Sequence, residues 1–261
     1  MAAPFDKYYY YEKSVQNPSN EVEFFTEKYK EIRNKTAKTL REDFCGTAAI
    51  SCEWVKQGKD YYSWGVDLDQ EPIDYGMENH LQKLNDDAQK RVTYINGNVL
   101  DTNTPKVDIC FAFNFSYFIF KKRSELITYF KAAYNSLEKD GVFFIDLFGG
   151  PDSQTEMTDV IEHKGFKYYW ECQKFNPLTN ECRFAIHFKR KGEKKRNDVF
   201  VYDWRMWFTS ELRDILSEAG FKDIITYWEG EDGDGGGDGE FYPTDTAENC
   251  EAWVTYIAAA K

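Results

Sequence analysis

Two periodicities alternate along the first 150 residues of the chain. Short apolar runs typical of buried strands alternate with segments in which apolar residues recur every three or four positions, as on one face of a helix. Strands that alternate with helices form right-handed βαβ units, so this pattern predicts a doubly wound α/β fold with a mostly parallel sheet. The expected strands are Thr39–Phe44, Tyr61–Leu68, Val92–Ile95, Val107–Phe113 and Gly141–Leu147.

The pattern changes after Gly149–Pro151, where strand-like segments follow one another without helices between them. Turn residues separate these segments, which predicts an antiparallel β insertion after the fifth strand. Its expected strands are Phe166–Phe175, Glu181–Arg190 and Asp198–Phe208. A helix is then expected from about Thr209 to Gly220, followed by closing strands at Phe221–Trp228 and Ala252–Ala258.

Residues 1–20 are aromatic, polar and turn-rich. The run Tyr8–Tyr11 is interpreted either as a lid over a ligand cleft or as a packing patch for the first helix. That helix is expected to begin at Asn20, which forms a capping-box pattern with Glu23. We expect one domain with an N-terminal lid and helix (1–36), a ligand-binding core (37–150), an insertion (151–208) and a C-terminal helix with closing strands (209–261).

Composition narrows the possible functions. Asp and Glu number 45 against 33 Lys and Arg, a net charge of −12, which disfavours nucleic acid as a partner. The basic run Lys189–Arg196 is expected to be a solvated hairpin turn. The acidic run Glu229–Glu240 does not fit the spacing of a calcium loop and is expected to be a flexible, solvated loop.

Six cysteines stand without a CxxC pair, which predicts free thiols, no metal centre and a reducing, cytoplasmic compartment. The chain also shows neither an apolar signal core at its start nor a run of 18 apolar residues. We therefore expect no contact with a membrane.

Candidate ligand-binding residues follow the strands, because open parallel sheets bind ligands outside the carboxyl ends of their strands. Small residues after the first strand let a ligand approach the backbone, and the next helix offers N–H groups to an anion. Asp67 lies 21 residues after Gly46 and is placed to accept hydrogen bonds from ribose hydroxyls, while Asp69 is expected to cap the next helix. Asn98 is placed either to contact an adenine or to form an Asx turn.

Five motifs stand in one order: Phe44-Cys45-Gly46-Thr47-Ala48, Gly65-Val66-Asp67-Leu68, Gly97-Asn98, the turn Leu137–Val142, and Glu211-Leu212 with Ala219-Gly220-Phe221. This order resembles class I S-adenosylmethionine-dependent methyltransferases of the small-molecule type. The resemblance implies a Rossmann-like fold, S-adenosylmethionine as cofactor and S-adenosylhomocysteine as product. The cofactor contacts it implies are Arg41, Glu42, Asp43, Cys45, Gly46, Thr47, Asp67, Leu68, Asn98, Val99, Asn114 and Phe115.

The first motif departs from the family pattern. Phe44 and Ala48 replace two glycines, and the strand end is unusually charged. Either Glu42 or Asp43 is placed to hold the cofactor ammonium.

The acceptor is expected between Asn114–Tyr117 and the insertion. Methyl transfer is an in-line displacement that needs no metal and no covalent nucleophile. The candidate catalytic residues are Asn114, Tyr117, His187 and Arg205, with His187 as the candidate base. In the strand that holds Arg205, the arginine would clamp a carboxylate, or the aromatic residues would wrap a cation, or the segment forms a second small core.

The sequence therefore predicts methyl transfer to a small-molecule acceptor. Three alternatives are a protein or nucleic-acid methyltransferase, a catalytically silent partner subunit with the same fold, and a nicotinamide oxidoreductase. The incomplete GxGxxG pattern disfavours the last. The acceptor atom and the oligomeric state stay open.

Overall fold

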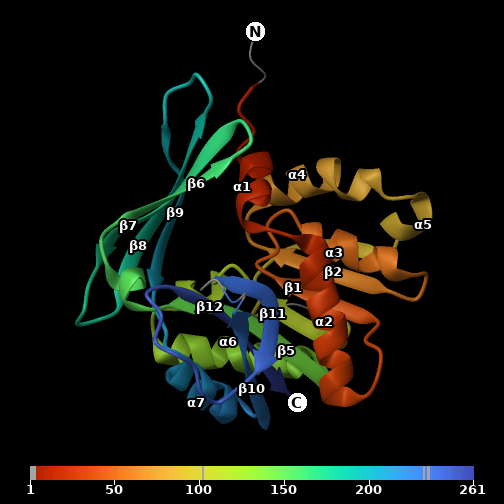
Figure 1. The fold of residues 1–261 in the computed structure, drawn as a ribbon. Coiled ribbons are helices and arrows are strands. Elements are labelled where there is room, and N and C mark those ends of the chain that lie inside the picture. The colour runs from red at the N-terminus through yellow and green to blue at the C-terminus, as the bar shows by residue number, and fades with distance from the viewer. Residues whose placement is uncertain (1–3, 102, 232, 234–235) are drawn as a thin grey trace.

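The chain folds around two sheets, shown in Figure 1. The computed structural model describes residues 4–101, 103–231, 233 and 236–261, and within them the main sheet has eight strands in the order β11-β10-β12-β5-β4-β1-β2-β3. These strands are β1 (Thr39–Asp43), β2 (Tyr62–Asp67), β3 (Val92–Asn96), β4 (Val107–Ala112), β5 (Leu137–Gly149), β10 (Asp223–Glu231), β11 (Gly237–Pro243) and β12 (Trp253–Ala260). The second sheet has the order β6-β7-β8-β9.

The central strands of the main sheet run parallel. β1 lies between β4 and β2 and is parallel to both, while β3 and β5 extend the parallel part on either side. β12 is antiparallel to β5, and β10 and β11 continue that edge in antiparallel order. The predicted Rossmann-like α/β fold is confirmed. Its carboxyl strand ends, where the candidate residues lie, share one edge of the sheet.

Helices cover both faces of the main sheet (Figure 1). Two consecutive residues of β5 show the reason: the Phe144 ring is tilted against the ring of Phe25 of α2 with centroids 5.3 Å apart, and the Phe143 ring lies 5.7 Å from that of Phe130 of α6. Successive side chains of a strand point to opposite faces, so β5 contributes to two cores. The helices are α1 (Lys7–Val15), α2 (Pro18–Arg33), α3 (Ala49–Trp54), α4 (Gln70–Asn79), α5 (Asp86–Gln89), α6 (Arg123–Ser136) and α7 (Thr209–Ala219).

The N-terminal segment is more helical than expected. α1 forms within the stretch predicted to be turn-rich, and Asp6 caps it by accepting a hydrogen bond from the Tyr9 N–H at 3.0 Å. The predicted start of α2 at Asn20 is wrong, because the helix begins at Pro18. Proline is favoured in the first turn of a helix, where its missing N–H leaves no hydrogen bond unmade.

The antiparallel insertion follows β5 and stands apart from the main sheet (Figure 1). β7 (Phe166–Phe175) and β8 (Glu181–Arg190) have the predicted bounds, and β9 (Arg196–Arg205) begins and ends earlier than Asp198–Phe208. β6 (Thr158–His163) was not predicted, because all but its last residue are exposed and it shows no apolar alternation. α1 packs on this sheet through Phe5, Tyr10 and Tyr11 (residue 5 just precedes the helix).

The prediction of a loop at Glu229–Glu240 is wrong for most of the described part of that run, although Glu231, Gly233 and residues 236–240 are exposed as predicted. β10 continues to Glu231, and β11 begins at Gly237 and pairs with it as a hairpin. Phe241 of β11 stabilises the hairpin by packing on Tyr256, with ring centroids 4.6 Å apart. Residues 232, 234 and 235 of the run, and residues 1–3 of the predicted lid, lie outside the described residues. None of the helices within the described ranges is both long and apolar enough to cross a membrane.

Candidate functional site

The turn after β1 has a left-handed backbone at three positions, only one of which is a glycine. Phe44, Gly46 and Ala48 all have left-handed φ angles, of 56°, 52° and 53°. An L-residue other than glycine adopts this conformation at a cost of roughly 1–2 kcal/mol. Phe44 and Ala48 thus occupy the two glycine positions of the motif and preserve its path, while adding side chains to the turn.

Asp67 ties this turn to the end of β2. Its Oδ2 accepts a hydrogen bond from the Gly46 N–H at 2.7 Å, and its Oδ1 accepts one from the Asp69 N–H at 2.9 Å. Each carboxylate oxygen offers about two acceptor positions, so both keep a position for a ligand hydroxyl. Partial burial raises the pKa of Asp67. Asp69 accepts from the Glu71 N–H at 3.0 Å, which confirms its predicted role as the N-cap of α4.

Leu68, Asn98 and Val99 follow the ends of β2 and β3 and have different surroundings. Leu68 follows Asp67 and is 69% exposed, an apolar surface beside the candidate ribose contact. Asn98 follows β3 and forms the Asx turn, because its Oδ1 accepts a hydrogen bond from the Leu100 N–H at 3.0 Å. Val99 is buried. Its side chain therefore packs in the core, and its carbonyl accepts from Arg41 at 2.7 Å.

Arg41 and Asp43 were predicted as cofactor contacts, and the structure corrects this. Both are buried, and Arg41 Nε lies 2.7 Å from Asp43 Oδ1. The Tyr129 hydroxyl also donates to Asp43, at 3.0 Å. Such a pair forms because a charge buried in the core needs an opposite charge and hydrogen bonds. The charged strand end is therefore structural at these two positions.

Glu42 points to the opposite face of β1. Its Oε2 accepts a hydrogen bond from the Ser51 N–H of α3 at 2.8 Å, and burial raises its pKa to about 8. Since Asp43 is engaged with Arg41, Glu42 is the acid of the two that stays a candidate for the cofactor ammonium. Cys45 is buried beside it, and desolvation raises the pKa of that thiol.

Thr47 connects the turn to the N-terminal helix. Its hydroxyl donates to Glu12 Oε1 of α1 at 2.7 Å, and the same carboxylate oxygen lies 2.6 Å from His80 Nε2 at the end of α4. α1 also packs on the insertion, so it spans from the first turn to the second sheet. The placement of α1 fits the lid interpretation of the N-terminal segment.

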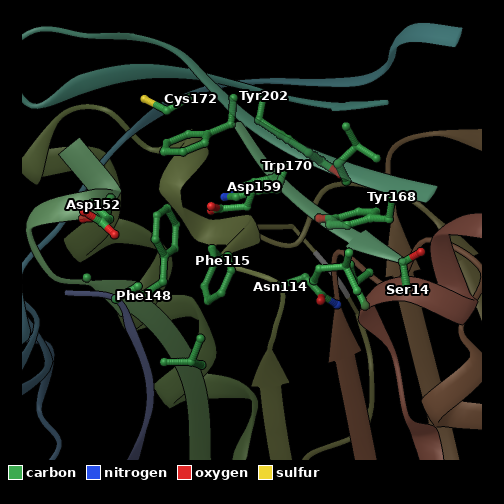
Figure 2. Close-up of a pocket in the computed structure, with 18 of the residues that line it drawn as sticks. Ser14, Asn114, Phe115, Phe148, Asp152, Asp159, Tyr168, Trp170, Cys172 and Tyr202 are labelled. Atoms are coloured by element: carbon green, nitrogen blue, oxygen red, sulfur yellow. The ribbon is translucent and has the colours of Figure 1, made fainter. Parts of the chain in front are cut away.

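A cavity of about 460 Å³ lies between the insertion and the strand ends of the main sheet (Figure 2). Asn114 and Phe115 form its floor at the end of β4, with left-handed φ angles of 56° and 57°. Their N–H groups donate to the Asp146 carboxylate at 2.7 and 2.9 Å, which fixes this turn. Burial raises the pKa of Asp146 to about 7. The aromatic side chains of the insertion that line the cavity are Tyr168, Trp170, Phe184, Tyr202 and Trp204.

Three predicted catalytic residues do not line this cavity. Tyr117 is buried, and its hydroxyl donates to the Asp146 carbonyl at 2.7 Å. His187 lies on the face of β8 opposite to Phe184 and Ile186, where it contacts Glu171 at 2.9 Å. The structure therefore places Tyr117 and His187 outside the cavity lining, engaged with other residues.

Arg205 is the third predicted catalytic residue that lies outside the cavity lining. Its guanidinium stacks on Trp207 at 3.8 Å, donates to the Lys121 carbonyl at 3.1 Å and contacts Glu211 at 3.3 Å. These contacts fix the junction between β9 and α7 and leave the guanidinium outside the cavity lining. Of the predicted catalytic residues, Asn114 is the one that lines the cavity.

Other cavity residues were missed by the sequence reasoning. Trp170 and Tyr168 alternate along β7, and this period of two was the signal that placed them on one face. Trp253 of β12 and Asp159 of β6 also line the cavity, but they come from segments distant in sequence. Only the fold brings these residues together.

Glu21 of α2 adds a half-buried acid near the strand ends, where its charge raises the pKa values of Glu42 and Asp146. Its Oε2 is buried and has no hydrogen-bond partner among the described residues. Burial raises the pKa of Glu21 from 4.5 to about 7. The folded chain therefore binds more protons than the unfolded chain between these pH values, so stability falls as pH rises through this interval.

Glu21→Gln is expected to remove this loss, because glutamine does not ionise. The melting temperature of the variant should approach or fall below that of the wild type near pH 4 and exceed it by roughly 2–4 °C at pH 8. Thermal melts across this range measure the difference. Glu23→Gln, at an exposed position of the same helix, is the control and should give no pH-dependent difference. A constant offset between Glu21→Gln and wild type would contradict the prediction.

The comparisons place the fold among solved methyltransferases. No protein-family model and no curated protein matches the chain. A Clostridium acetobutylicum S-adenosylmethionine-dependent methyltransferase is similar over 97% of this chain and 96% of its own, with a TM-score of 0.72 and 19% identity. The S-adenosylmethionine-bound amino pentose methyltransferase of Micromonospora echinaspora is involved in calicheamicin biosynthesis. It is similar over 100% of this chain and 98% of its own, with a TM-score of 0.69 and 13% identity.

A sugar N-methyltransferase from Streptoalloteichus is similar over 100% of this chain and 94% of its own, with a TM-score of 0.66 and 16% identity. The similarity extends over nearly the whole of each chain, insertion included. The chain therefore has the fold of these S-adenosylmethionine-dependent methyltransferases.

Proposed function

We propose that this protein transfers the methyl group of S-adenosylmethionine to a small-molecule acceptor. The observation that carries the proposal is the hydrogen bond between the Gly46 N–H and Asp67. It joins the first turn and the end of β2 into one surface and orients a carboxylate that still has acceptor positions for ribose hydroxyls. The whole-chain likeness to methyltransferases, one of them bound to S-adenosylmethionine, supports it.

The residues at the strand ends fit this cofactor. Asp67 would bind the ribose, the exposed Leu68 would cover one face of the adenine, and Glu42 would lie nearest the ammonium. Cys45, Gly46 and Thr47 provide the turn beneath the amino-acid part. Asn98 would accept a hydrogen bond from the adenine amino group, because its Oδ1 keeps a second acceptor position beside the Asx-turn bond. When bound, S-adenosylmethionine supplies a methyl group on a positively charged sulfur.

The cavity beside Asn114 and Phe115 would hold the acceptor. Asp146 fixes the backbone of these two residues, so the floor of the cavity is rigid where an in-line displacement needs alignment. The aromatic walls from the insertion exclude water around the acceptor. The acidic net charge and the integral insertion favour a small molecule over a nucleic acid. All six cysteines are free, which supports a cytoplasmic location.

Leu68→Ala is expected to weaken S-adenosylhomocysteine binding by about tenfold while leaving the fold intact. Burying a leucine against a ligand contributes roughly 1.5–3 kcal/mol, and alanine keeps part of that contact. Leu178→Ala is the matched control, because Leu178 is 93% exposed and far from the strand ends in sequence. Calorimetric titration measures both affinities. Equal affinities for the two variants would contradict the placement of the adenine.

Turnover separates the enzyme from a silent partner subunit of the same fold. We expect release of S-adenosylhomocysteine when the protein is given S-adenosylmethionine and a panel of amines, thiols, phenols and carboxylates. A filtered small-metabolite pool should support release, and a macromolecule fraction should not. Cofactor binding without release on any acceptor would favour the silent subunit, and release only with macromolecules would favour the protein or nucleic-acid methyltransferase.

A further inference from the structure

The lining of the acceptor cavity is both aromatic and acidic. Trp170, Tyr202 and Trp204 form one wall, with Tyr202 and Trp204 stacked at a centroid distance of 4.3 Å. Among the described residues that line the cavity, three carry a carboxylate and none is a lysine, arginine or histidine. The cavity therefore has a negative electrostatic potential and π-faces directed into it.

The three carboxylates come from three separate elements: Asp152 from the 3₁₀ turn after β5, Asp159 from β6 and Glu229 from β10. Within the part of the chain that the structure describes, Asp152 and Asp159 form no ion pair, whereas eighteen ion pairs form elsewhere. Asp159 is the register partner of Trp170 in the β6–β7 pair, and Figure 2 shows both side chains extending into the same cavity.

The cations of the insertion are directed elsewhere. Arg183 pairs with Asp203, residues that are absent from the cavity lining, and Arg205 pairs with Glu211. Asp152 and Asp159 are thus left without cationic partners beside a set of aromatic faces, while the Glu229 carboxylate accepts a hydrogen bond from the Gly239 N–H of β11 at 3.2 Å. Aromatic faces and carboxylates both attract a cation, and together they offset the loss of its water on entry.

We propose that the cavity binds its acceptor as an ammonium ion, so the methylated group is the nitrogen of a small amine. This inference rests on the proposed function for its chemical step and on the cavity alone for its binding step. An acceptor that carries a carboxylate or phosphate would meet the like charges of Asp152 and Asp159 and no cation among the described lining side chains. Asp159 is the residue nearest in register to the aromatic wall and holds the ammonium there.

The chemical step of this proposal is transfer of the methyl group from the sulfonium to the amine nitrogen. The bound ammonium first loses one proton to a cavity carboxylate, which frees the lone pair of the nitrogen. That lone pair forms the new N–C bond while the C–S bond of the sulfonium breaks and its electron pair stays on sulfur. The products are the methylated ammonium and neutral-sulfur S-adenosylhomocysteine, and the cavity carboxylate returns its proton to water.

Three probes with one ring and different charge test the binding step: benzyltrimethylammonium, benzyl alcohol and benzoate. Each is titrated into the full chain with and without S-adenosylhomocysteine, and tryptophan fluorescence reports occupancy of the cavity. The cation should bind at least about tenfold more tightly than the alcohol, because a desolvated cation–π contact contributes about 2 kcal/mol. Benzoate should bind more weakly than the alcohol.

Asp159→Asn removes one charge from the cavity without changing side-chain size. The substitution should lower the affinity for benzyltrimethylammonium about fivefold and leave the affinity for benzyl alcohol unchanged. Glu162→Gln is the matched control, because it removes the same charge from the opposite face of the same strand, where Glu162 pairs with Lys167. The control should bind all three probes as the wild type does.

Separate readouts distinguish failure of this inference from failure of the proposed function. Calorimetry with S-adenosylhomocysteine tests the cofactor site without an acceptor. If that ligand binds but the three probes bind alike, or Asp159→Asn matches Glu162→Gln, the amine inference is overturned and the proposed function stands. If the cation is preferred but S-adenosylhomocysteine does not bind, the cavity is a cation site and the methyltransferase proposal fails.

Discussion

Asp67→Ala is expected to lower the affinity for S-adenosylhomocysteine by at least about a hundredfold. Two hydroxyls donating to one carboxylate contribute about 1.5–3 kcal/mol each, and the substitution removes both. It also removes the acceptor of the Gly46 and Asp69 N–H groups, so the first turn loses its side-chain bond to β2 and keeps the backbone bond from the Cys45 N–H to the Val66 carbonyl. Calorimetric titration measures the affinity, and circular dichroism checks that the fold persists.

Two comparisons separate ribose binding from a disturbed turn. A 2′,3′-dideoxy analogue of S-adenosylhomocysteine should bind the wild type about as weakly as the natural compound binds Asp67→Ala. The variant should bind both compounds alike. Asp69→Ala, which loses the cap of α4 at a cost of about 1 kcal/mol, should retain the wild-type preference for the natural compound. A variant that still prefers the natural compound would refute the ribose assignment of Asp67.

Arg41→Met is expected to lower the free energy of unfolding by about 3–5 kcal/mol, the largest stability effect we predict. The substitution leaves the Asp43 carboxylate buried with the Tyr129 hydroxyl as a neutral partner, and an uncompensated buried charge is costly. The Val99 carbonyl also loses its donor. Chemical denaturation gives the free energy of unfolding for each variant.

The double variant Arg41→Met with Asp43→Leu distinguishes charge from packing. Replacing a buried ion pair with apolar residues of similar volume is often close to neutral, so the double variant should recover most of the stability lost in Arg41→Met. If the single substitution costs less than about 1 kcal/mol, or the double variant recovers nothing, the pair is not held by its charges.

The main sheet, the position of Asp67 at a strand end and the capping role of Asp69 could be predicted because they follow from local pattern. Buried strands of a parallel sheet are near-continuous apolar runs, and the residue after each strand faces the ligand edge whatever the rest of the chain does. The alternation of β7 and β8 likewise fixed their bounds. The fold prediction therefore needed little information beyond periodicity and turn residues.

Some site residues were misplaced because alternation along a strand shows which residues share a face, but not which face lines the cavity. It groups Tyr202 with Trp204, and His187 with its own alternate neighbours, but it does not say which face of the sheet meets the cavity. Arg41 and Asp43 are two residues apart, so a strand places them on one side, and only the packing of α6 shows that this side is a closed core. A charged strand end has the same sequence whether it binds a ligand or an internal partner.

The N-terminal helix α1 covers part of both candidate ligand regions. α1 contacts the first turn through Glu12 and Thr47, and it lines the acceptor cavity through Tyr11. The ion pair between Lys7 of α1 and Glu71 of α4 lies at the surface, so it contributes at most about 1 kcal/mol to holding the helix in place. α1 therefore contacts both candidate ligand regions, so a displacement of this one helix would uncover the first turn and the cavity together.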